Sequence, residues 1–185
     1  MGNQKTTRRR FIKNTSLGIL SAGIISKEGL ANSIHGKESE SSKISFRRLG
    51  RTDAFVSDIG TGAPENTAVL RATLKAGVNF IETGEAYGNG RNEELIGEVI
   101  KDFNRKNIFI ATKAFPAYKI FKSTEDIIER ANGSLKRLQT EYIDLYMIHQ
   151  AQNMVKVKDE YFHRACDQLK KEGKIRHVGL SCHGQ

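Results

Sequence analysis

Cysteine occurs twice in this 185-residue sequence, and tryptophan does not occur at all. Cys166 and Cys182 have neither CxxC spacing nor the spacing of metal ligands, so the sequence predicts no metal site and no redox pair of that kind. The absence of tryptophan excludes nothing. The chain has room for one domain of ordinary size, but it is too short for a complete eight-stranded α/β barrel, which typically needs about 250 residues.

Nucleic-acid motifs are missing as well. The net charge of +9 suggests such a partner, but residues 1–33 alone hold six Lys or Arg against one Glu. The RNP-type aromatic motif and the Cys/His spacing of zinc fingers are both absent. Because most of the positive charge is confined to the start of the chain, we predict no nucleic-acid partner.

The sequence also lacks a long apolar run. Leu17–Ile25 is too short, and too rich in Gly and Ser, to span a bilayer. We therefore predict that the chain is not an integral membrane protein. Together with the basic start and small residues near Ala31–Ser33, this short apolar run indicates an export signal over residues 1–33. Thr7–Lys13 resembles the twin-arginine signal, which implies export by the twin-arginine machinery to the periplasm or cell envelope. The alternative is a disordered basic tail.

A folded domain is expected after this leader. Residues 34–43 are mostly polar and predict a linker, which leaves residues 44–185 for the domain. Ser45–Gly50 and Ala54–Ser57 flank a turn near Thr52 and predict a small β-hairpin. In an exported protein a disulfide between the two cysteines stays open as an alternative to free thiols.

Beyond the hairpin, strand and helix patterns alternate. Short apolar runs predict strands at Val56–Gly60, Phe80–Thr83, Ile108–Thr112, Tyr142–Ile148 and Ile175–Ser181. Helical spacing of apolar residues predicts helices at Asn66–Ala76, Glu93–Phe103, from Ser123 to about Leu138, and Glu160–Lys171. Regular alternation of this kind predicts an α/β fold with a parallel sheet and right-handed crossovers.

Three predicted strands end in chemically active groups. Glu82, Lys113 and His149 each lie at the end of a strand, and Tyr87 follows Glu82 by five residues in a glycine-rich loop. The C-terminal ends of parallel strands meet at one edge of a sheet, where reaction groups collect. These four residues are therefore the candidate site.

Other polar residues near these strands receive structural interpretations. Asn92 is expected to cap the second helix and Ser123 the third. Glu85 is interpreted as a solvated loop charge. Asp144, inside a predicted strand, is expected to brace neighbouring backbone rather than to react.

Six segments, in order, resemble the aldo-keto reductases over about residues 46–183. They are Arg48–Thr52, Gly77–Ile81, Tyr87–Gly97, Ala111–Lys113, Tyr142–His149 and Gly173–Ser181. The resemblance implies a (β/α)8 TIM barrel whose bottom is closed by the N-terminal hairpin, here as a partial barrel with about five parallel strands. It also implies NADPH, bound in extended form, and reduction of a small carbonyl substrate.

The same resemblance implies roles for individual residues. Tyr87 would be the general acid, Lys113 would lower the pKa of its phenol, and His149 would orient the substrate carbonyl. Glu82 stands at the position of the family's aspartate, which pairs with the lysine and lies near the nicotinamide ribose. The cofactor-binding positions are Gly60, Thr61, Glu82, Ser181 and Cys182.

The sequence departs from the family in three ways. Glu82 is one methylene longer than aspartate, Cys182 replaces the asparagine that follows the family's serine, and strands six to eight are missing. Three interpretations therefore stay open. The chain is the N-terminal fragment of a carbonyl reductase, an inactive truncated remnant, or a non-enzymatic binding subunit. The substrate is not predicted, because the family's specificity loops lie mostly beyond residue 185.

Overall fold

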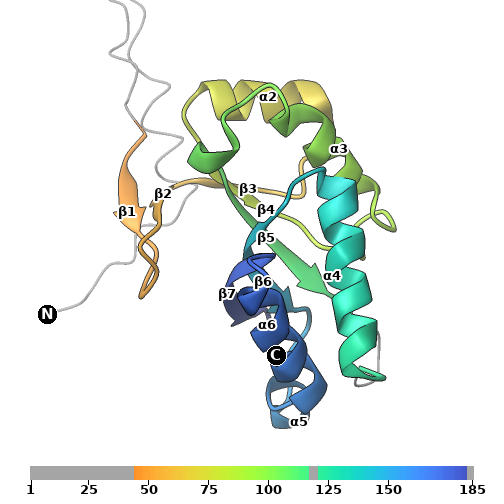
Figure 1. Ribbon diagram of the computed structural model, residues 1–185. Coiled ribbons are helices and arrows are strands. Elements are labelled where there is room, and N and C mark those ends of the chain that lie inside the picture. Colours follow the sequence, from red (N-terminus) through yellow and green to blue (C-terminus); the bar gives the residue numbers. More distant parts are fainter. Residues whose placement is uncertain (1–43, 117–120, 183–185) are drawn as a thin grey trace, which may run out of the picture. The chain divides into compact units, whose positions relative to one another are not determined.

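The computed structural model describes residues 44–116 and 121–182, shown in colour in Figure 1. The predicted signal peptide and linker, residues 1–33 and 34–43, lie outside the described residues. The first described element is an antiparallel hairpin of β1 (Phe46–Arg48) and β2 (Phe55–Ser57). Thr52 closes its turn, because the Thr52 hydroxyl donates to the Leu49 carbonyl at 2.7 Å. The predicted hairpin and the place of its turn are confirmed.

The sheet has five parallel strands in the order β3-β4-β5-β6-β7, which is also their order in the sequence. The strands are β3 (Gly60–Gly62), β4 (Phe80–Glu82), β5 (Phe109–Ala114), β6 (Ile143–Ile148) and β7 (Ile175–Leu180). The parallel α/β prediction is confirmed. Within the described part of the chain, β3 and β7 are the outer strands of this sheet.

One predicted strand, Val56–Gly60, is wrong. Val56 belongs to β2 of the hairpin, and the sheet begins only at Gly60. The side chain of Asn79 accepts the Ser57 N–H at 2.7 Å and donates to the Phe55 carbonyl at 3.0 Å. This long-range link fixes the end of β2, and the chain then bends before it enters β3.

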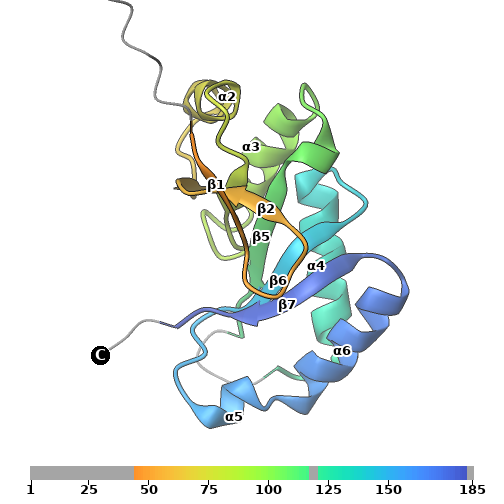
Figure 2. The ribbon, with the colours of Figure 1, turned by 90° about the vertical axis from the view of Figure 1, so that its left-hand side faces the viewer.

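Helices cross between the strands on one side of the sheet (Figures 1 and 2). They are α2 (Thr67–Lys75), α3 (Arg91–Ile100), α4 (Thr124–Leu138), the short α5 (Met154–Val157) and α6 (Glu160–Lys171), with a 3-10 turn η1 at Arg105–Asn107. The four longer helices match the predicted ones within a few residues, and α5 was not predicted. Helix α4 lies between α3 and α6.

Four of these helices have a side-chain cap at their N-terminus, from Asn66 (α2), Ser123 (α4), Asn153 (α5) and Asp159 (α6). Asn66 accepts the Val69 N–H at the start of α2, and Ser123 accepts the Asp126 N–H at the start of α4, as predicted for Ser123. The prediction for Asn92 is wrong, because Gly90 is the N-cap residue of α3, with φ +88 and no side-chain cap. A Cβ at Gly90 would lie 2.6 Å from the Arg137 side chain, so glycine is required there.

The core lies between the sheet and the helices. Ile110, Tyr146 and Ile148 face it from the two central strands, and Ile127 and Phe162 face it from α4 and α6. Successive residues of a strand point to opposite faces, so Lys113 and His149 lie on the face away from this cluster. The alternation thus leaves the two candidate groups outside the apolar core.

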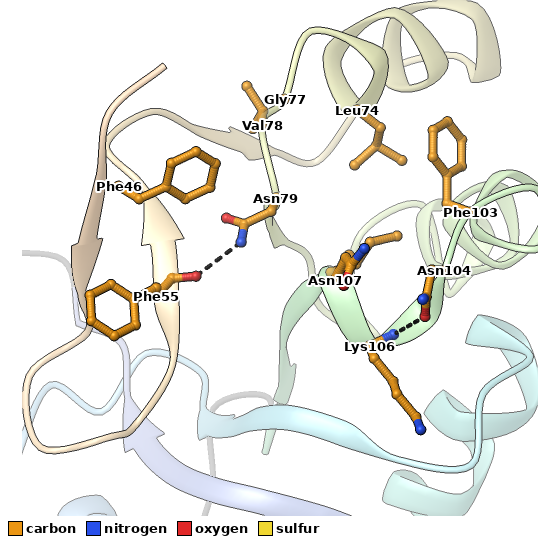
Figure 3. Close-up of a pocket in the computed structure, with 11 residues that line it drawn as sticks. Phe46, Phe55, Leu74, Gly77, Val78, Asn79, Phe103, Asn104, Lys106 and Asn107 are labelled. Carbon is orange, nitrogen blue, oxygen red and sulfur yellow. Dashed lines mark hydrogen bonds between the residues drawn. The ribbon is translucent and has the colours of Figure 1, made fainter. Parts of the chain in front are cut away.

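A cavity of about 550 Å³ lies between the hairpin and the residues that lead into β4 and β5 (Figure 3). Phe46 and Phe55 line it from the hairpin, and Val78 and Phe103 line it from the other side. This cavity is at the N-terminal edge of the sheet, whereas the candidate groups follow the C-terminal ends of the strands. In the described part of the chain, no helix has the length and apolar character to cross a membrane.

Candidate active site

Lys113 is the centre of the candidate site. It lies on β5 with 3% of its surface exposed. Its Nζ donates to the Thr83 carbonyl at 2.7 Å and to the Tyr87 hydroxyl at 2.9 Å, and it forms an ion pair with the Glu82 carboxylate. Burial lowers the pKa of Lys113 to about 8, so the amine is mostly charged at pH 7 but titrates close to it.

Glu82 reaches the lysine despite its extra methylene. Its carboxylate contacts Lys113 and lies beside Gly62 on the neighbouring strand β3. A Cβ at Gly62 would lie 3.6 Å from Glu82 Oε2. The pairing that a glutamate made doubtful is therefore present in the structure.

Tyr87 lies on the loop between β4 and α3. A tight turn positions it, since the Tyr87 N–H donates to the Gly84 carbonyl at 2.9 Å. Lys113 Nζ lies 4.4 Å from the centroid of its ring. Burial raises the pKa of Tyr87, so the predicted lowering by Lys113 is wrong. Burial disfavours the charged phenolate, so the phenol stays protonated at neutral pH.

His149 follows β6 and completes the cluster. Its backbone N–H donates to the Ala114 carbonyl at 2.9 Å, and 5% of its surface is exposed. Its ring meets the Tyr87 ring edge-on with centroids 5.5 Å apart, and the Phe115 ring lies at 5.2 Å. The structure thus brings together all four predicted residues, which are Glu82, Tyr87, Lys113 and His149.

The predicted cofactor positions lie on both sides of this cluster. Gly60, Thr61 and Glu82 line a cavity of about 380 Å³ at the β3 edge of the sheet. Ser181 lies at the other edge, where its N–H donates to the Ile148 carbonyl at 2.9 Å. Cys182 is an exposed free thiol, and the buried Cys166 is also free, so the two form no disulfide. Among the described residues, no group of three His, Cys, Asp or Glu could hold a metal.

Two residues near the cluster were misinterpreted from the sequence. Glu85 is not a solvated charge, since its side chain is 13% exposed and pairs with Arg130. Asn92 is not a cap. It accepts the Thr83 hydroxyl at 2.7 Å and donates to the Pro64 carbonyl at 2.7 Å. The sequence signal for both was their place just before and just after the glycine-rich loop of Tyr87.

The interpretation of Asp144 is confirmed. Its carboxylate accepts the backbone N–H of Ile110 at 3.0 Å, which braces β5 against β6. Arg105 and Arg176 donate to the same carboxylate at 2.7 and 3.0 Å. All three partners stabilise the fold at the N-terminal edge of the sheet.

Comparison with known proteins gives consistent matches. The aldo/keto reductase family model matches residues 57–184. The chain is 36% identical over 128 residues to the aldo-keto reductase YhdN of Bacillus subtilis, covering 65% of this chain and 38% of that protein. It is 36% identical over 121 residues to a probable voltage-gated potassium channel subunit beta of Oryza sativa, covering 56% and 37%. An aldo-keto reductase from Klebsiella pneumoniae, solved in complex with NADPH, is similar with a TM-score of 0.64 at 28% identity, covering 77% of this chain and 51% of that one.

The fold and the cluster define a parallel α/β domain with a lysine–tyrosine–histidine site at the C-terminal edge of its sheet. With the family matched over most of its length, the chain belongs to the aldo/keto reductase family. Its five strands correspond to part of that family's (β/α)8 barrel, as predicted. The chain spans less than half the length of the curated relatives described above.

Proposed function

We propose that this chain is the N-terminal part of an NADPH-dependent oxidoreductase that reduces aldehydes or ketones to alcohols. The observation that carries the proposal is the contact of Lys113 Nζ with both the Tyr87 hydroxyl and the Glu82 carboxylate, beside His149. The pKa of Lys113, lowered by burial to about 8, is the kind of perturbed value that collects at functional sites.

Each residue of the cluster has a chemical task. The Tyr87 phenol, protonated because burial raises its pKa, donates its proton to the carbonyl oxygen. The Lys113 ammonium, 2.9 Å from the phenol oxygen, stabilises the phenolate that remains. The buried His149 ring directs the carbonyl toward the phenol. Glu82 and the Thr83 carbonyl hold the ammonium in place.

The described residues fit the nicotinamide end of a dinucleotide. When bound, reduced nicotinamide supplies the hydride that the carbonyl carbon accepts. Gly60 and Gly62 line the cavity beside Glu82, and a Cβ at Gly60 would clash with the Phe80 ring at 2.7 Å. Thr61 and Ser181 offer hydroxyl groups from the two edges of the sheet. Cys182 is a weak donor where the family's pattern has an amide.

We also propose export by the twin-arginine machinery to the periplasm or cell envelope. The motif at Thr7–Lys13 and the apolar run Leu17–Ile25 support the proposal. Residues 1–33 fused to a reporter that folds before export should carry it out of the cytoplasm. Replacing Arg8 and Arg9 by lysine should retain it inside. Equal export of both fusions would contradict the twin-arginine route.

The reductase proposal is tested by the loss of NADPH absorbance with simple aldehydes, using the whole gene product that contains this chain. Tyr87→Phe should lower turnover at least about 100-fold, since it removes the proton donor. Tyr161→Phe is the matched control, because Tyr161 is exposed on α6 and should leave turnover unchanged. No turnover by the parent, or equal turnover of parent and Tyr87→Phe, would contradict the proposal.

A second candidate is a non-catalytic role, as a binding subunit or an inactive remnant. The similarity to a potassium channel subunit beta supports the binding subunit, and the glutamate at position 82 supports loss of activity. Calorimetry with NADPH on the 185-residue chain separates these possibilities. Tight binding would exclude an inactive remnant, and tight binding without turnover would favour the binding subunit.

A further inference from the structure

Glu85 lies on the Tyr87 loop, two residues before the tyrosine, and its carboxylate is nearly buried. One carboxylate oxygen, Oε1, accepts two hydrogen bonds, from the Phe115 backbone N–H at 2.7 Å and from Arg130 at 2.9 Å. Arg130, on α4, also donates to Asp126 of the same helix at 3.2 Å, so two carboxylates fix the position of its guanidinium. A nearly buried carboxylate with a backbone partner and an arginine is a specific contact rather than a solvated charge.

The backbone of Glu85 makes a second link to the same strand. Its N–H donates to the Lys113 carbonyl at 3.3 Å. The residue therefore contacts Lys113 of β5 through its main chain and Phe115, which directly follows β5, through its side chain. These two contacts fix the loop of Tyr87 against the strand of Lys113, and they set the separation of phenol and amine.

The link extends to the third member of the cluster. Phe115, whose N–H is held by Glu85, packs its ring 5.2 Å from the ring of His149. A shift of Phe115 would therefore change the packing of the histidine as well as the loop of the tyrosine. The Glu85 carboxylate bonds Phe115 and Arg130, which support the loop of Tyr87 and the packing of His149, so it acts through the supports of the cluster.

We infer that Glu85 is a positioning residue that holds Tyr87, Lys113 and His149 in register through Phe115 and Arg130. The inference rests on the proposed function for its effect on turnover, but its structural part can be tested without turnover. A misplacement of about 1 Å in such a cluster costs about 100-fold in rate. Replacing the carboxylate also leaves Arg130 without one of its two partners.

The structural test is carbon-13 NMR of the Tyr87 phenol in the 185-residue chain, with Tyr87→Phe assigning the signal. Glu85→Ala should release the loop, expose the phenol and move its titration midpoint down toward the usual value of about 10. Glu85→Gln keeps an oxygen for the Phe115 N–H and should give a smaller shift. The matched control is Glu129→Gln, an exposed acid on α4, which should leave the signal unchanged.

The functional test is the turnover of the same variants in the whole gene product. We expect kcat to fall about 10- to 100-fold in Glu85→Ala and less in Glu85→Gln, with no change in Glu129→Gln. If Glu85→Ala does not fold, Glu85→Gln decides. An unshifted phenol signal in the folded Glu85 variants would overturn the inference. Absence of turnover in the parent protein would instead contradict the proposed function. The NMR experiment would then still test the positioning role of Glu85.

Discussion

Charged groups are buried at both the N-terminal and the C-terminal ends of the strands, but only those at the C-terminal ends can change their charge near neutral pH. At the N-terminal edge, Asp144 binds two arginines and a backbone N–H, and Arg105 and Arg176 lie 4.1 and 3.7 Å from the centroid of the Tyr142 ring. Arginine does not lose its proton in proteins, so this network keeps one charge state. At the C-terminal edge, the buried cation is Lys113, whose pKa of about 8 allows a change of charge near neutral pH.

The comparison shows that burial and pairing alone do not identify a reactive site. Asp144 is as buried as Lys113 and has as many partners. The difference lies in the type of group, because lysine, tyrosine and histidine exchange protons, whereas the arginines around Asp144 do not. We therefore expect turnover to depend on the C-terminal edge and stability on the N-terminal edge.

The largest expected effect comes from Lys113→Met. The change removes the ammonium next to the Tyr87 phenol, so turnover should fall by about 1000-fold, within the usual range for a proton-transfer group. The free energy of unfolding should not fall, because burial of the Lys113 charge is itself unfavourable and the partner Glu82 is partly exposed and can be solvated. Steady-state kinetics and urea unfolding measure the two quantities. A large loss of stability with retained turnover would show that Lys113 serves the fold rather than catalysis.

Asp144→Ala should give the opposite result. It removes the carboxylate partner of Arg105 and Arg176 and the acceptor of the Ile110 N–H, so the free energy of unfolding should fall by about 3 kcal/mol. Turnover per folded molecule should stay close to that of the parent. Asp167→Ala, at an exposed position on α6, is the control and should change neither. Loss of turnover in folded Asp144→Ala would show that the Asp144 network contributes to catalysis, contrary to this expectation.

The pH dependence of stability should also separate the two edges. The pKa of Lys113 is lowered from 10.5 to about 8 on folding. Between these values the unfolded chain binds more protons, so this residue makes stability rise with pH from about 8 to 10.5. Its destabilising effect is complete below pH 8. Urea unfolding of the parent and of Lys113→Met at pH 7.5 and 10 should show this rise only in the parent.

The smallest expected effect is that of Asn92→Ala. Asn92 links Thr83, whose carbonyl accepts from Lys113, to the loop at Pro64. Its loss should cost about 1 kcal/mol of stability and a few-fold in turnover. Asn132→Ala, at an exposed position on α4, removes an amide of the same size far from this link. Equal turnover of the two variants would show that Asn92 does not help to position Lys113 through Thr83.

Local patterns predicted most of the fold. The periodicity of β5, β6 and α6, and the cap at Ser123, depend on residues close in sequence, and all were placed within a few residues. The strand at Val56–Gly60 was wrong because the contact that ends β2 comes from Asn79, 22 residues away from Ser57. Long-range contacts of this kind leave no local signal.

The same limit applies to the site. Strand ends gave Glu82, Lys113 and His149, because topology alone brings them to one edge. The roles of Glu85 and Asn92 depend on partners 30 and 28 residues away in sequence, so a single sequence does not show them. The pKa of Tyr87 was predicted in the wrong direction, since the sequence shows a neighbouring cation but not the burial of the phenol.

The most direct test of the paired action of Lys113 and Tyr87 is the pH dependence of kcat/KM for carbonyl reduction by the whole gene product. We predict that kcat/KM falls above a pH of about 8, where Lys113 loses its proton. Lys113→Arg, which stays charged, should lose this fall even if its rate is lower. A flat parent profile from pH 7 to 9.5, or the same fall in Lys113→Arg, would contradict the account.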